Sequence, residues 1–257
     1  FARPHTEPNL FPRVTSPTAR HLLRSWLTRR LNVLFAHLTL PVTFATTAGE
    51  YRPDQHWQDM LTVNDIVTLT GMLLTESQPT TTRLLFFDLI DRYCVLHDRA
   101  GKPADVLNAR FVSELADAID PALGPLRDAI AADLRDAWAS IRESLWNGLL
   151  DESHVASADL AIRAPDGREE LRLSKDEFAT RLLAALRNTT HGYDLRGDQF
   201  RHVLLRHNCQ LPETVRYLAL GLWIAFLSKP SAFWRGRADF DAVRVRRKDV
   251  PPPASGS

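Results

Sequence analysis

The sequence predicts an all-α, bundle-like protein of about eight helices with one small β-hairpin on its surface. Three observations predict this class. Apolar residues recur at helical spacing along most of the chain, and proline and glycine fall mainly between these segments. Only one segment alternates apolar and polar residues as a strand does. With 44% hydrophobic and 25% charged residues, the 257-residue chain can bury a substantial core.

The first half of the chain contains five predicted helices. Ser16 followed by Pro17 is typical of a helix start, because serine caps the first turn and proline suits its first position. Apolar residues then recur to Phe35, and Pro41 ends the pattern. Proline and glycine separate the next segments, and Asp120-Pro121 is expected to cap the last of them. These further helices are expected at about 54–76, 81–98, 104–119 and 121–150.

The second half begins with the hairpin. Leu160 and Ile162 alternate before the turn sequence Pro165-Asp166-Gly167, and Leu171 and Leu173 alternate after it. Ser174-Lys175-Asp176-Glu177 then forms a capping box, which predicts a helix from there to about His191. Two more helices are expected at about 196–207 and 212–227.

The pattern indicates a single helical domain over 16–240, with sub-lobes 16–150 and 151–240 as a finer division. Residues 1–15 are expected to form an N-terminal arm. Residues 241–257 form a basic, proline-rich tail that is expected to be disordered.

Composition also indicates in which compartment the protein works and which classes of partner it has. The net charge is +1, so no global basic field indicates nucleic acid. The two cysteines, Cys94 and Cys209, lie in apolar surroundings and are expected to be buried thiols rather than a disulfide framework. The longest apolar run, from Tyr217 to Leu227, is shorter than the roughly 20 residues of a membrane span. With no signal-peptide pattern, these features favour a cytoplasmic protein without membrane partners.

Familiar enzyme motifs are missing. The chain has no Walker loop, no Rossmann glycine motif, no zincin or α/β-hydrolase motif and no Cys-x-x-Cys. The remaining candidates are sites that helices alone can build from arginine, histidine and acids.

The preferred candidate is the polar end of the capping-box helix. Arg187 and His191 are four residues apart, so they share one helix face, and Asn188 lies beside them. Arginine can neutralise a scissile phosphate, and histidine can move a proton near neutral pH. Together they could drive attack of an RNA 2′-hydroxyl on its own phosphate, with no metal or cofactor expected. A structural interpretation stays open, in which His191 complements the helix dipole and Arg187 pairs with a nearby acid.

This arrangement resembles the HEPN superfamily, including its actinobacterial members. These helical proteins often act as metal-independent ribonucleases in bacterial defence and toxin–antitoxin systems. Their motif is arginine, a polar residue and then histidine after a gap of four to six; here Arg187-Asn188 matches and the gap to His191 is three. The resemblance covers roughly residues 173–230. It implies Arg187, Asn188 and His191 as catalytic residues, RNA as substrate, and a homodimer, because two such motifs usually meet in one active site.

Two other segments satisfy the gap of the same motif. Arg201-His202 followed by His207 also has a polar second residue, whereas Arg92-Tyr93 followed by His97 does not. Either remains an alternative site.

A metal-dependent alternative centres on His97-Asp98. This pair resembles the central motif of HD-domain phosphohydrolases, in which divalent metal activates water against a phosphoester. His56 would be the upstream ligand. The later ligand would be Asp117, Asp120 or Asp133.

A third alternative is not enzymatic. The chain could be a helical adaptor or regulatory protein that binds a protein partner such as an antitoxin. Trp234, beside Arg235 and Arg237, could anchor such a partner. The basic tail Arg244–Lys248 could contact phosphates.

Overall fold

The computed structural model describes residues 11–38, 53–96, 107–147, 159–163, 170–191 and 211–228. Most of these residues are helical, so the all-α prediction is confirmed. The helix expected at 196–207 and the tail at 241–257 lie outside the described residues, as does Cys209. The described elements are α1 (Pro17–Leu38), α2 (Pro53–Thr75), α3 (Pro79–Leu96), α4 (Ala109–Ala118), the 3-10 helix η3 (Pro121–Leu123), α5 (Pro125–Asn147), β1 (Asp159–Arg163), β2 (Glu170–Ser174), α7 (Lys175–Thr190) and α9 (Val215–Ser228).

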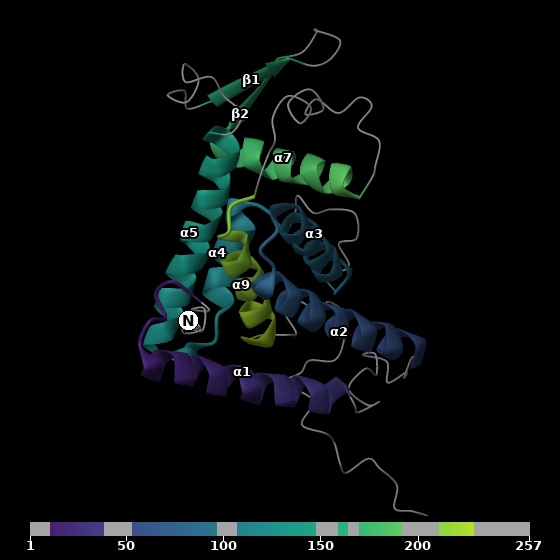
Figure 1. The fold of residues 1–257 in the computed structure, drawn as a ribbon, viewed down its shortest axis with the longest axis vertical. Coiled ribbons are helices and arrows are strands. Elements are labelled where there is room, and N and C mark those ends of the chain that lie inside the picture. Colours follow the sequence, from purple (N-terminus) through teal and green to yellow (C-terminus); the bar gives the residue numbers. More distant parts are fainter. Residues whose placement is uncertain are drawn as a thin grey trace, which may run out of the picture.

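The helices surround one buried helix. α9 is buried along almost its whole length and packs against α1, α2, α3, α4 and α5. Figure 1 shows α1 at one end of the long axis, α7 and the hairpin at the other, and α5 between them. α9 has 14 residues and all but one of its apolar side chains are buried in the core. Within the described ranges, no helix combines the length and hydropathy needed to cross a bilayer.

The predicted hairpin is confirmed. β1 and β2 pair antiparallel, with Leu160 opposite Leu173 and Ile162 opposite Leu171. The turn between the strands lies outside the described residues. Leu173 is 2% exposed and leads directly into α7, so the hairpin is joined to the helix that carries the candidate site.

Prolines begin helices more often than the sequence pattern predicted. Pro17 starts α1 as expected, with the Ser16 hydroxyl accepting a hydrogen bond from the Ala19 N–H at 3.1 Å. Pro53 and Pro79, expected to lie between the helical segments, are instead the first residues of α2 and α3. The first helical position suits proline, because its missing N–H would have no partner inside the helix there.

The helix expected from residue 121 is divided. Asp120 caps η3 rather than α5, accepting a hydrogen bond from the Ala122 N–H at 2.9 Å. Gly124 then takes φ 55° and ψ −129°, and α5 starts at Pro125. A residue before proline avoids helical backbone, and glycine tolerates positive φ, so Gly124-Pro125 breaks the helix.

The described end of the expected N-terminal arm is docked on the core. Phe11 and Val14 are fully buried, and the Phe11 ring stacks on Tyr217 of α9 with centroids 6.3 Å apart. Between them, Arg13 bonds through its backbone N–H and its guanidinium to the buried carboxylate of Asp133 on α5, at 3.0 and 2.6 Å.

Candidate functional site

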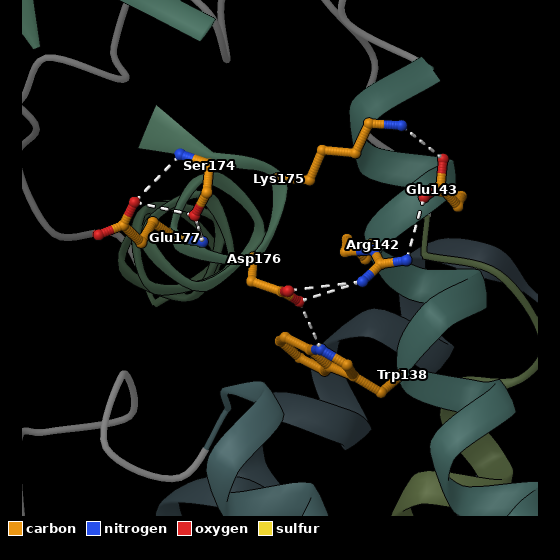
Figure 2. Close-up of polar contacts among 7 residues, drawn as sticks. All are labelled: Trp138, Arg142, Glu143, Ser174, Lys175, Asp176 and Glu177. Atoms are coloured by element: carbon orange, nitrogen blue, oxygen red, sulfur yellow. Dashed lines mark hydrogen bonds and ion pairs between the residues drawn. The ribbon is translucent and has the colours of Figure 1, made fainter. Parts of the chain in front are cut away.

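The N-terminus of α7 is fixed by the predicted capping box (Figure 2). The Ser174 hydroxyl accepts from the Glu177 N–H, and the Glu177 carboxylate accepts from the Ser174 N–H at 3.0 Å. These hydrogen bonds lower the pKa of Glu177, since they favour its charged form. Asp176 and Glu177 also complement the helix dipole in the first turn.

A polar junction ties the same end of α7 to α5. Figure 2 shows the Asp176 carboxylate between Trp138 and Arg142 of α5. Trp138 Nε1 donates to Asp176 at 3.1 Å, and Arg142 Nη1 lies 3.4 Å from its Oδ2. Lys175 reaches Glu143 at 3.3 Å. These contacts, with the buried apolar stripe of α7, set the direction of the helix and hence the position of its far end. The buried residues of α7 are Phe178, Ala179, Leu182, Leu183, Ala185 and Leu186.

Two of the polar residues at the far end serve the helix itself. The hydroxyls of Thr189 and Thr190 donate to the carbonyls of Ala185 and Leu186, at 2.9 and 2.8 Å. Such bonds back into the helix leave Arg187, Asn188 and His191 as the candidate functional side chains of this end.

The structure brings Arg187 against Asp91 of α3. Arg187 Nε donates to Asp91 Oδ1 at 3.1 Å and Nη2 donates to Oδ2 at 2.9 Å, which is a bidentate pair. Nη1 donates to the Asn188 Oδ1 at 3.2 Å. Asn188 therefore contacts the guanidinium, as a residue that orients it would.

His191 converges on the same carboxylate. Its Nε2 lies 3.3 Å from Asp91 Oδ2 and 3.9 Å from Asp88 Oδ1. The Nε2 atom is buried but is not aligned for a hydrogen bond to any described group. The backbone N–H of His191 donates to the Arg187 carbonyl at 3.0 Å, so His191 closes the last turn of α7.

The cluster is partly open to solvent. The side chains of Arg187, His191 and Asp91 are 14%, 21% and 27% exposed, and that of Asp88 is 40% exposed. Two carboxylates thus face one guanidinium and one imidazole. Two hydrogen bonds to Asp91 hold the guanidinium in one orientation at this end of the helix.

Asp88 and Asp91 were not predicted from the sequence. The structural interpretation left open for Arg187 was a pair with an acid near it in the chain, whereas its observed partner lies 96 residues upstream. One signal was available, since the two aspartates are three apart on a largely apolar stretch of helix and so share a face. That signal indicates a polar face without identifying its partner.

The alternative sites are only partly covered by the described residues. Arg92 forms an ion pair with Asp65 of α2 at 3.2 Å, both side chains being exposed. His97, Asp98, Arg201, His202 and His207 lie outside the described residues, as do Trp234 and the segment 244–248, and nothing is described of the His56 side chain.

The proposed later ligands of the metal site have structural contacts. Asp120 accepts from Trp26 Nε1 at 2.9 Å as well as capping η3, and Asp133 is buried against Arg13. Asp117 is exposed and lies 3.5 Å from Arg135 Nη2. Asp120 and Asp133 therefore already have partners that a metal ion would have to displace.

Comparisons with known proteins give no relative. No family model matches the chain, and neither the search of curated proteins nor the search of solved structures returned a match.

Proposed function

We propose that this protein is a HEPN-like, metal-independent endoribonuclease whose site is Arg187, Asn188 and His191, with Asp91 as a positioning residue. One observation carries the proposal. Arg187 and His191, one turn apart at the end of α7, converge on one carboxylate and keep part of their side chains exposed. A bacterial defence or toxin–antitoxin role in the cytoplasm belongs to the same proposal.

The reaction follows from the two side chains. His191 accepts the proton of an RNA 2′-hydroxyl as its oxygen attacks the adjacent phosphorus. The bond from phosphorus to the 5′-oxygen breaks, and a protonated imidazole returns a proton to that oxygen. Arg187 stabilises the negative charge that develops on the phosphate. The products are a 2′,3′-cyclic phosphate and a 5′-hydroxyl end.

Asp91 supports both groups in this scheme. It holds the guanidinium through two hydrogen bonds and lies within ion-pair distance of the imidazole. A phosphate would therefore meet an arginine already oriented, and would compete with Asn188 for Nη1. In the proposed homodimer, a second copy of His191 would supply the proton donor for the leaving oxygen.

The same contacts favour a second candidate, a non-catalytic adaptor. Arg187 and Asp91 join α7 to α3, and an ion pair of this kind also suits a purely structural connection. The two candidates differ in what His191 must do, because only the ribonuclease needs an imidazole that transfers a proton.

The test compares wild type with His191→Gln on labelled RNA in excess EDTA. Glutamine keeps a polar side chain beside Asp91 but cannot transfer a proton. We expect EDTA-resistant cleavage with 2′,3′-cyclic phosphate ends, and a loss of roughly 10²–10⁴-fold in the variant, typical of general acid–base catalysis. Thermal unfolding of His191→Gln should stay close to wild type.

Arg181→Ala is the matched control, since this arginine is exposed on the same helix. It should cleave like wild type, whereas Arg187→Ala should not. Wild type that leaves RNA intact, or cleavage that survives both His191→Gln and Arg187→Ala, would exclude this site. Cleavage abolished by EDTA would instead favour the metal-dependent alternative at His97-Asp98.

A further inference from the structure

The charge of the chain is unevenly distributed, and α1 carries a concentrated positive share. Its sequence contains four arginines and no acidic residue. Because the whole chain has a net charge of only +1, the remainder is net acidic. A charge asymmetry of this kind indicates a surface for a polyanion. The basic residues of α1 with described side chains are Arg20, His21, Arg24, Arg29 and Arg30.

One of these arginines has a structural role. Arg30 donates from Nε to the Leu227 carbonyl at 2.7 Å and from Nη2 to the Ser228 carbonyl at 2.6 Å. These bonds satisfy carbonyls at the C-terminus of α9, which have no partner within the helix. The side chains of Arg24 and Arg29 are exposed to solvent.

The exposed face of α1 combines hydrogen-bonding side chains with these two arginines. His21, Thr28 and Asn32 are exposed and recur at intervals of seven and four residues, so they form one line along the helix. By the same helical geometry, Arg24 lies on one side of this line and Arg29 on the other. At 1.5 Å per residue the helix is about 33 Å long, enough to follow a nucleic-acid backbone over several phosphates.

The opposite face of α1 is already used. Leu23, Trp26 and Leu34 are buried in the core at 0–2% exposure. A helix that binds a membrane surface must insert its apolar face into lipid, and this face is not available. The exposed apolar residues of α1 are Leu22, Val33 and Phe35. Leu22 and Val33 lie on one side of the polar line, eleven residues apart, and Phe35 lies on the other side, so the three do not form one continuous stripe. The polar line between arginines therefore favours phosphate and ribose over lipid.

We infer that the exposed face of α1, with Arg24 and Arg29 beside the line His21, Thr28 and Asn32, is an RNA-binding surface separate from the candidate active site. RNA as the ligand rests on the proposed function. Figure 1 shows α1 and α7 toward opposite ends of the molecule, so this surface contacts a part of the RNA distant from the scissile phosphate. It contributes to affinity for long RNA, not to the chemical step.

Binding is measured separately from cleavage, in the His191→Gln background. The probe is a fluorescent single-stranded RNA of about 30 nucleotides, longer than the roughly 4–16 nucleotides that one single-strand site usually occupies. Adding Arg24→Gln and Arg29→Gln should weaken its affinity about tenfold near 0.1 M salt and reduce the slope of log affinity against log salt by about 1.4. Arg110→Gln with Arg135→Gln removes two arginines from α4 and α5 and should change neither value. Unfolding curves check that all variants fold.

The outcomes separate the two proposals. RNA binding that depends on α1 in a protein that does not cleave RNA supports this surface and overturns the ribonuclease. If wild type cleaves RNA but Arg24→Gln with Arg29→Gln leaves the RNA affinity unchanged, the proposed RNA-binding surface on α1 is overturned and the ribonuclease proposal is not. The RNA-binding surface is also overturned if the His191→Gln protein does not bind RNA. It is overturned equally if the α1 variant loses binding to phosphatidylserine vesicles but keeps its affinity for RNA.

Discussion

At the scale of single residues, the candidate site depends on one carboxylate, that of Asp91, which lies against two basic side chains. Asp91 is bound by Arg187 in bidentate geometry and lies 3.3 Å from His191, whereas the next residue, Arg92, pairs with Asp65 at the exposed surface. Exposed pairs contribute roughly 0–1 kcal/mol, because water screens them and both side chains lose freedom. The less exposed Arg187–Asp91 pair is the contact that orients the site.

The capping box makes stability depend on pH. Hydrogen bonds from Ser174 lower the pKa of Glu177 below its ordinary value of 4.5, so the folded state binds that proton more weakly than the unfolded chain. The contribution is therefore fully present above about pH 4.5 and is lost as pH falls through the lowered folded pKa. We expect Glu177→Gln to melt below wild type at neutral pH, with the gap closing on acidification.

Glu114→Gln on α4 is the control for this measurement, since its carboxylate is exposed and pairs with Arg110 without capping a helix. A gap between wild type and Glu177→Gln that stays constant from pH 7 to pH 3 would contradict the capping contribution. Ser174→Ala should cost about 1 kcal/mol, typical of a lost N-cap.

At the scale of the elements, the local signals were reliable where chemistry within a few residues decides the structure. The hairpin and the Ser174 cap were predicted because alternation and capping residues act locally. The break at Gly124 was missed, because Asp120-Pro121 is equally suited to start an α-helix or a 3-10 turn. Only the following pair, Gly124-Pro125, distinguishes the two.

The packing of α5 on α9 depends on Gly221. A Cβ at this position would lie 1.9 Å from Leu134 Cδ2 and 2.8 Å from Leu134 Cγ, and Leu134 is fully buried. We expect Gly221→Ala to lower the free energy of unfolding by about 1–3 kcal/mol through overpacking. The double variant Gly221→Ala with Leu134→Ala should lose less stability than the sum of the losses in the two single variants, because the added methyl group fills part of the space that the shortened side chain leaves. Urea denaturation measures all three.

Gly71→Ala is the matched control on α2. Its added Cβ would meet nothing within 4 Å, so this change should stabilise by about 0.5–1 kcal/mol through helix propensity. Equal effects at the two glycines would show that close packing at Gly221 does not matter.

At the scale of the whole molecule, the sequence predicted the class and most elements but not how they meet. The pair between Arg187 and Asp91 joins residues 96 apart, and that between Arg13 and Asp133 joins residues 120 apart. No local pattern specifies such partners, because many arginines and aspartates satisfy the same chemistry. The candidate site was therefore predicted on α7 and missed on α3.

Docking of the segment before α1 illustrates this long-range order and gives the last prediction. Phe11 is fully buried and stacks on Tyr217, and Arg13 bonds to Asp133, whose side chain is 1% exposed. Hydrogen bonds to Asp136 and Asp133 raise the pKa of Arg13, so its guanidinium stays charged at any moderate pH. Phe11→Ala should lower the free energy of unfolding by about 3–5 kcal/mol, since it leaves a cavity beside α9.

Phe35→Ala on α1 is the matched control, because this ring is 44% exposed and its removal should cost about 0.5 kcal/mol or less. Urea denaturation at neutral pH compares the two. If both phenylalanine variants unfold at the same urea concentration as wild type, residues 11–14 contribute nothing to the core. If only Phe11→Ala is destabilised, the stability of the helical domain depends on a segment that precedes its first helix.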